Sequence, residues 1–106
     1  MDNDKNIIDQ IVERIVNTAH PDKIILFGSR ARGDTNELSD YDLLVVMSFT
    51  GKRRDIMVEI DMALAGLGIA RDVIILSPQE YEETQKIPGT ISQPAAEEGI
   101  VLYERK

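Results

Sequence analysis

The chain of 106 residues has no cysteine, no tryptophan and one histidine, and aromatic residues make up only 5% of it. The lack of cysteine excludes a disulfide framework and a thiolate metal site. No apolar run approaches the roughly 20 residues that a membrane-spanning helix requires. The first ten residues, MDNDKNIIDQ, are acidic and polar, unlike a secretory leader. These absences predict a soluble cytoplasmic protein without a membrane partner.

Positive charge is also scarce, because 12 lysines and arginines stand against 19 acidic residues, for a formal net charge of −7. General nucleic-acid binding needs a basic surface, so the composition disfavours it. It does not exclude a small anionic ligand held by a few local cations or by metal ions. The length predicts a single domain, residues 1–106, with a real core and little material for a second lobe.

The apolar pattern predicts a small mixed α/β sheet with helices packed on it. Apolar residues at helical spacing predict helices over 4–19 and 52–66. Short apolar, β-branched runs predict strands over 23–27, 40–47 and 70–77, with a closing strand at 100–104. Two further helices are expected: a short one that starts after Ser77, and one over 91–98. The segment GSRARG reads as a turn or as one helical turn.

Two local signals concern the last two helices. The segment SPQE places Ser77 as an N-cap, Pro78 at the first helical position and Glu80 where a capping box needs it. Pro94 leaves the start of the last helix open, because proline is comfortable only in the first turn of a helix.

Three aspartates lie at predicted strand starts. Asp40 and Asp42 are two residues apart in one strand, so their side chains are expected on the same side, with Cα atoms roughly 6.6 Å apart. Two carboxylates held this close repel each other unless a cation lies between them. Asp72 precedes VIIL much as Asp42 precedes LLVV. If these strands are neighbours, the three carboxylates converge on a site suited to Mg²⁺, or to Mn²⁺, and to phosphoryl chemistry.

The turn before these aspartates suits an anion. Gly28 lets the backbone approach a ligand closely, and Ser29 offers a hydroxyl and an N–H. Arg30 and Arg32 carry forked donors that match phosphate oxygens. Each feature alone has an ordinary explanation as a solvated strand edge, a simple turn or surface cations. Their combination within a short stretch predicts a nucleoside triphosphate site beside bound metals.

The stretch LFGSRARGDTNELSDYDLLVV, residues 26–46, resembles the signature of the polymerase-β-like nucleotidyltransferase superfamily. The whole chain is similar in length and in its late segment, PGTISQPAAEEGIVLYER, to the minimal nucleotidyltransferases (MNT) of that superfamily. The resemblance implies that Gly28 and Ser29 contact the triphosphate and that Asp40 and Asp42 ligate two Mg²⁺ ions. Asp72 matches the third carboxylate, which shares one metal and helps to deprotonate the attacking hydroxyl.

The implied reaction is attack of a hydroxyl on the α-phosphate of a nucleoside triphosphate, with release of pyrophosphate. Many minimal nucleotidyltransferases resemble antitoxins that transfer AMP from ATP to a tyrosine of a helical HEPN-type toxin. The leading hypothesis is therefore an adenylyltransferase that silences such a partner. Two alternatives stay open: a non-catalytic module that masks its partner, and nucleotidyl transfer to a small molecule.

Overall fold

The computed structural model describes residues 2–33 and 40–105. Its elements follow one another as α1 (Asp2–Ala19), β1 (Lys23–Phe27), α2 (Ser29–Arg32), β2 (Tyr41–Val46), α3 (Arg53–Leu64), η1 (Ala65–Leu67), β3 (Arg71–Leu76), α4 (Pro78–Thr84), α5 (Ser92–Glu98) and β4 (Ile100–Glu104). The strands form one sheet in the order β3-β2-β1-β4. β1 is antiparallel to both β2 and β4, and β2 is parallel to β3. The predicted mixed α/β architecture is confirmed.

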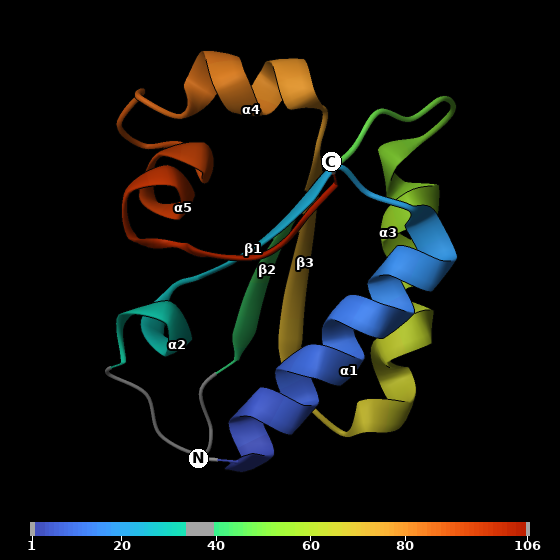
Figure 1. Cartoon of the computed structure of the whole chain (residues 1–106). Coiled ribbons are helices and arrows are strands. Elements are labelled where there is room, and N and C mark those ends of the chain that lie inside the picture. The colour runs from blue at the N-terminus through green and yellow to red at the C-terminus, as the bar shows by residue number, and fades with distance from the viewer. Residues whose placement is uncertain (1, 34–39, 106) are drawn as a thin grey trace.

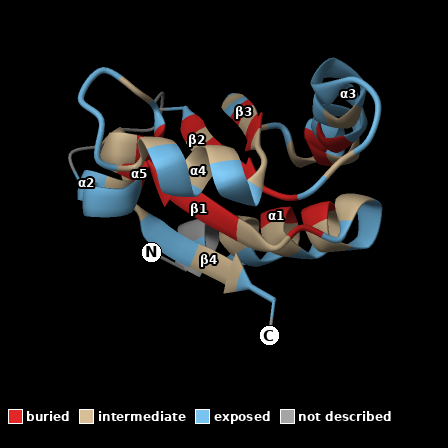
Figure 2. Ribbon diagram, turned by 90° about the horizontal axis from the view of Figure 1, so that it is seen from above, coloured by how far each residue is buried: buried red, intermediate tan, exposed pale blue. Residues whose placement is uncertain are grey.

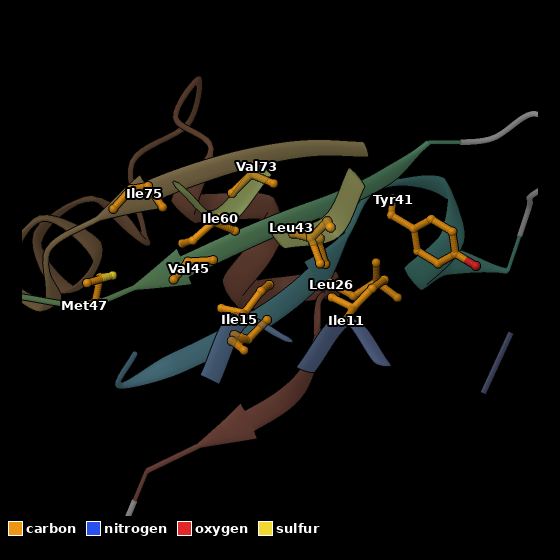
Figure 3. Close-up of a cluster of buried hydrophobic side chains, with 12 residues drawn as sticks. Ile11, Ile15, Leu26, Tyr41, Leu43, Val45, Met47, Ile60, Val73 and Ile75 are labelled. Carbon is orange, nitrogen blue, oxygen red and sulfur yellow. The ribbon is translucent and has the colours of Figure 1, made fainter. Parts of the chain in front are cut away.

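Helices cover the sheet on both faces (Figure 1). α1 and α3 lie on one face, while α4 and α5 lie on the other. The larger core fills the first face, where Ile11 and Ile15 of α1 meet Ile60 and Leu64 of α3 over the strands. Figure 3 shows this cluster, with Leu43 and Val45 of β2 pointing into it. The opposite face holds a smaller core around Leu44, Val46 and Ala95.

The two cores fix the direction in which every strand side chain points. Successive side chains of a strand alternate between the faces of a sheet. In β2, Tyr41, Leu43 and Val45 belong to the larger core, and Leu44 and Val46 belong to the smaller one. Asp42 therefore lies on the face that carries α4 and α5. The same alternation in β3 puts Asp72 on that face, because Ile74 and Leu76 pack against the smaller core.

Most predicted elements are confirmed within a residue or two. The strand predicted over 40–47 is shorter, so Asp40 lies just before β2. The helix predicted over 52–66 ends as a 3₁₀ turn over 65–67. α5 begins at Ser92, which puts Pro94 in its first turn, where a missing N–H costs no intrahelical hydrogen bond. GSRARG contains the single helical turn α2.

None of the helices within residues 2–33 and 40–105 combines the length and the apolar character that crossing a bilayer requires.

The capping box predicted at α4 is confirmed. The Ser77 hydroxyl accepts a hydrogen bond from the backbone N–H of Glu80 at 3.1 Å, and the Glu80 carboxylate accepts one from the backbone N–H of Ser77 at 2.8 Å. Arg53, at the start of α3, pairs with the same carboxylate at 2.8 Å. These bonds, first of all the one from the Ser77 backbone, lower the pKa of Glu80. The cap therefore also ties α4 to α3.

Replacing Ser77 with alanine should remove the N-cap and lower the free energy of unfolding by about 1 kcal/mol. The midpoint of urea unfolding measures this. Because the pKa of Glu80 is lowered in the fold, its contribution is present above the ordinary pKa of the carboxyl and is lost as pH falls through the folded value. Ser77→Ala keeps the backbone N–H that contributes most to this lowered pKa, so both proteins should lose this contribution in acid and the difference between them should change little with pH. An equal stability of both proteins at neutral pH would contradict the capping role.

Candidate active site

One row of side chains crosses three strands at the end of the sheet that carries the glycine turn. Phe27 of β1 is the register partner of Asp42, and Asp42 is the register partner of Asp72 in β3. Directly opposed residues point to the same face of a sheet and lie within about 5.5 Å of each other at their Cα atoms. The strands that bear Asp42 and Asp72 are neighbours, which was the condition for their side chains to converge. Their carboxylates lie side by side on the face of α4 and α5.

Gly28 closes over this row. Its backbone angles, φ 77° and ψ −158°, lie in a region that glycine alone adopts readily. A Cβ at this position would overlap the Oδ2 atom of Asp42. The main chain thus approaches the Asp42 carboxylate as closely as a glycine permits. Gly28 was predicted to let the backbone approach a ligand closely. The nearby Asp42 side chain also requires a glycine at this position.

The charge on Asp42 is unfavourable in the metal-free fold. Burial of this half-buried carboxyl raises its pKa, and the negative charges of Asp72 and Asp40 raise it further. Arg32 acts in the opposite direction and lowers the pKa. Both of the other predicted carboxylates therefore act electrostatically on Asp42. A cation placed among them would relieve this repulsion.

Asp40 and Asp72 are exposed, whereas Asp42 is half-buried between them and the glycine turn. Within residues 2–33 and 40–105, no three acidic or histidine side chains are grouped as a ready metal-binding set. The donors present are carboxylate oxygens, which match Mg²⁺ in kind. Mg²⁺ is commonly held by one or two carboxylates together with substrate phosphates, so a preformed cage is not required. The assignment of Asp40, Asp42 and Asp72 as metal ligands stays a prediction.

The two arginines of α2 make contacts with the protein. The Arg30 guanidinium stacks over the ring of Tyr41, 4.0 Å from its centroid. Arg32 pairs with Glu98 of α5 at 3.6 Å. Figure 1 shows α2 at the end of β1, close to the start of β2. Both contacts fasten the glycine turn to elements that follow it in the chain. The predicted phosphate contacts of both arginines remain predictions.

The internal hydrogen bonds of α2 indicate where an anion could bind in this turn. The N–H groups of Ala31 and Arg32 donate to the Gly28 carbonyl, and that of Gly33 donates to the Ser29 carbonyl. Ser29 precedes these donors, and its side chain is partly exposed beside Gly28. Its hydroxyl and N–H are therefore the turn's candidates for a phosphate oxygen.

Two contributors to the site were not anticipated from the sequence. Tyr41 packs in the larger core, on the face of the sheet opposite to the aspartates. Its stacking with Arg30 gives it a second role as a support for the glycine turn. The sequence around Glu98 gave no sign that this residue contributes to the site, because a glutamate near a helix end is common. Only the fold brings it to Arg32.

Comparison with known proteins identifies the family. Residues 9–106 match the polymerase beta nucleotidyltransferase family. The chain belongs to this family. An inferred protein adenylyltransferase of Methanocaldococcus jannaschii is 38% identical over 84 residues, which cover 76% of this chain and 77% of that protein. This nucleotidyltransferase therefore has relatives of similar size.

Solved structures of low sequence identity share the fold. A chain of a toxin–antitoxin complex with AMP-PNP superposes with a TM-score of 0.70 at 19% identity, covering 93% of this chain and 74% of that one. A chain from a complex of the tri-AMPylated Shewanella oneidensis HEPN toxin with its MNT antitoxin gives a TM-score of 0.64 at 18% identity, covering 95% and 72%. The expected nucleotidyltransferase fold is confirmed.

Replacing Gly28 with alanine should force the backbone out of its glycine-only conformation and displace the Asp42 carboxylate. We expect a loss of about 1–3 kcal/mol in the free energy of unfolding, measured by urea titration. Gly33→Ala is the matched control, because Gly33 also has a positive φ, 84°, but a Cβ there meets nothing within 4 Å. A smaller loss is expected for Gly33→Ala. Equal losses would show that backbone strain alone, and not the contact with Asp42, accounts for Gly28.

Replacing Asp42 with asparagine should raise the melting temperature in metal-free buffer at neutral pH. The raised pKa means that the folded chain holds a proton that the unfolded chain has already lost, so this carboxyl makes stability fall as pH rises from its ordinary pKa through the folded value. The gain should vanish below the ordinary pKa. Asp9→Asn, at an exposed position on α1, serves as the control. A lower melting temperature at neutral pH would contradict the repulsion.

Proposed function

We propose that this chain, as a single domain over residues 1–106, transfers AMP from ATP to a hydroxyl of a HEPN-type toxin, as the antitoxin of that partner. The observation that carries the proposal is the in-register pair Asp42 and Asp72 beneath the Gly28 turn, in a chain of the nucleotidyltransferase family. The inferred adenylyltransferase relative supports AMP as the transferred group.

The carboxylates would hold metal ions. Asp42 and Asp40 would ligate two Mg²⁺ ions, with Asp72 sharing one of them. Bound Mg²⁺ would supply charge stabilisation at the phosphates and a template for in-line displacement. The residues fit this role, because burial and the charges of Asp72 and Asp40 raise the pKa of Asp42, and because their oxygen donors suit a hard cation.

The chain's own groups would position the nucleotide. The Ser29 hydroxyl and N–H would donate to triphosphate oxygens, which the glycine at position 28 admits close to the main chain. Arg32 would offset part of the negative charge beside Asp42, as it does in the protein alone. Such positioning matters because phosphoryl transfer depends mainly on alignment and electrostatic stabilisation.

The bond changes are those of a substitution at phosphorus. The acceptor hydroxyl oxygen forms a bond to the α-phosphorus of ATP, and the bond from that phosphorus to the bridging oxygen of the β-phosphate breaks. Pyrophosphate leaves with the electron pair of that bond. The hydroxyl proton passes to the Asp72 carboxylate, which is exposed at the edge of the row and open to an incoming acceptor.

A tyrosine of a HEPN-type toxin is the proposed acceptor. Two structures that share this fold come from toxin–antitoxin complexes: one holds AMP-PNP, and the other holds a HEPN toxin that carries three AMP groups. A tyrosine hydroxyl fits the bond changes above. A chain of this length has little material to enclose both ATP and an acceptor, so a partner protein would complete the site.

Mass spectrometry of a HEPN-type protein encoded beside this chain, incubated with the chain, ATP and Mg²⁺, tests the proposal. We expect the mass of AMP to be added, mapping to a tyrosine. Asp42→Asn should slow the transfer on the order of 10³-fold, because the site loses several kcal/mol of charge stabilisation. Chelation of Mg²⁺ should have a similar effect.

Asp9→Asn removes an exposed carboxylate on α1, outside the carboxylate row, and should transfer AMP like the wild type. Full transfer by Asp42→Asn would refute the metal role of the carboxylate row. A tight complex without any added mass would instead indicate an antitoxin that masks its partner without catalysis.

A further inference from the structure

A cavity of about 240 Å³ opens between α3 and the edge of the sheet. Its lining consists of Met57, Val58, Asp61, Arg71, Asp72 and Val73. Asp72 is part of this lining and also belongs to the carboxylate row on the other face of the sheet, so the cavity borders the proposed reaction site around the edge strand. We refer to this cavity, together with the exposed outer side chain of Met62, as the α3–β3 groove.

The outer wall of the groove is unusually apolar for a surface helix. Met62 is 71% exposed, Val58 is 44% exposed and Met57 is 37% exposed. Val58 and Met62 are four residues apart, so they lie on the same side of α3. Figure 2 shows that the outer side of α3 is largely exposed. Clustered apolar side chains on such a surface indicate a contact with another molecule.

The inner wall of the groove is an edge strand. β3 has β2 as its neighbour on one side, and no other strand within residues 2–33 and 40–105 pairs with it. Its six residues, RDVIIL, include no proline and no lysine, which are common blocks against pairing at edges. An extended segment of another protein could therefore lie along β3 by backbone hydrogen bonds and place its side chains against α3.

Acidic side chains border the apolar wall. Asp55 and Glu59 are exposed on α3, on the side of Val58 and Met62. Asp61 holds Arg71 by a 2.9 Å ion pair, which occupies the main cation of the groove. Arg54, four residues before Val58, is exposed on the same side and offsets part of this charge. The border keeps a small excess of negative charge, and a segment with lysine or arginine beside its apolar residues would complement it.

We propose that the α3–β3 groove docks the protein that accepts the nucleotide. The occupant is an apolar segment of that partner, flanked by basic side chains, which brings its acceptor hydroxyl to Asp72. This inference rests on the proposed function and adds where the partner binds. The groove fits this occupant because its lining combines apolar side chains of α3 with Asp72, a carboxylate of the proposed reaction site.

Other surfaces fit this role less well. A second cavity, of about 380 Å³, includes Val46 and so lies at the far end of β2 from Asp42. In its lining, Lys23 pairs with Glu104 at 3.4 Å and Arg105 pairs with Asp22 at 3.1 Å. Ile100 and Val101 are exposed on β4, at the opposite edge of the sheet from β3.

The test measures the dissociation constant of the complex between this chain and the HEPN-type protein encoded beside it, without ATP. Met62→Lys should raise that constant at least about tenfold, as expected when a central apolar contact is lost and like charges meet. Ile87→Lys is the matched control, since Ile87 is 49% exposed outside the groove. It should bind like the wild type.

A thermal shift with ATP and Mg²⁺ is measured on the same proteins. Met62→Lys should show the wild-type shift, because Met62 lies outside the carboxylate row. Unchanged partner binding by Met62→Lys would overturn the docking site even if AMP transfer occurs. If the wild-type chain binds the partner but transfers no AMP, the proposed function is refuted. The effect of Met62→Lys on the dissociation constant would then still test the docking site.

Sedimentation of the chain alone distinguishes a second copy as the occupant. We expect no self-association that depends on Met62. A wild-type dimer that Met62→Lys dissociates would overturn the proposal, because the groove would then be an interface between copies.

Discussion

The close approach of the Gly28 backbone to the Asp42 carboxylate is the constraint on which the site depends. No other residue could supply both the backbone conformation and the space that the carboxylate occupies. The contact holds the end of β1 against the start of β2 and keeps the carboxylate half-buried. Burial beside Asp72 and Asp40 then raises the pKa of Asp42. The same arrangement that costs stability in the protein alone prepares a binding place for cations.

The sheet makes this arrangement possible because it has two unlike faces. The larger core, between the strands and the pair α1 and α3, supplies most of the buried apolar side chains. The smaller core on the opposite face includes Phe27 from the row but leaves Asp42 half-buried and Asp72 exposed. Stability and proposed chemistry are thus divided between the faces of one thin domain. In β2 and in β3, the aspartate comes directly before an apolar run. The two runs pair in parallel and in register, and this pairing sets Asp42 opposite Asp72.

Much of the fold could be predicted because its signals are local. The amphipathic helices, the β-branched strands and the Ser77 capping box each arise from residues close together in the sequence. The boundaries that differed depend on longer-range contacts. Asp40 was expected within a strand, but the pairing of β2 begins at Tyr41 opposite Arg71. The start of α5 was open because Pro94 is compatible with several starts, and the packing of Ala95 on the sheet selects one.

The sequence by itself determined the elements, the candidate carboxylates and the resemblance of the glycine turn to a nucleotidyltransferase signature. These features follow from the spacing of residue types along the chain, because they depend on residues that are close together in the sequence. Only the tertiary structure decided that Asp42 and Asp72 are register partners, that Arg30 stacks on Tyr41 and that Arg32 meets Glu98. It also decided that an apolar wall of α3 leads to Asp72. Strand order and register bring together residues that lie far apart in the chain, and no spacing within a single segment encodes that meeting.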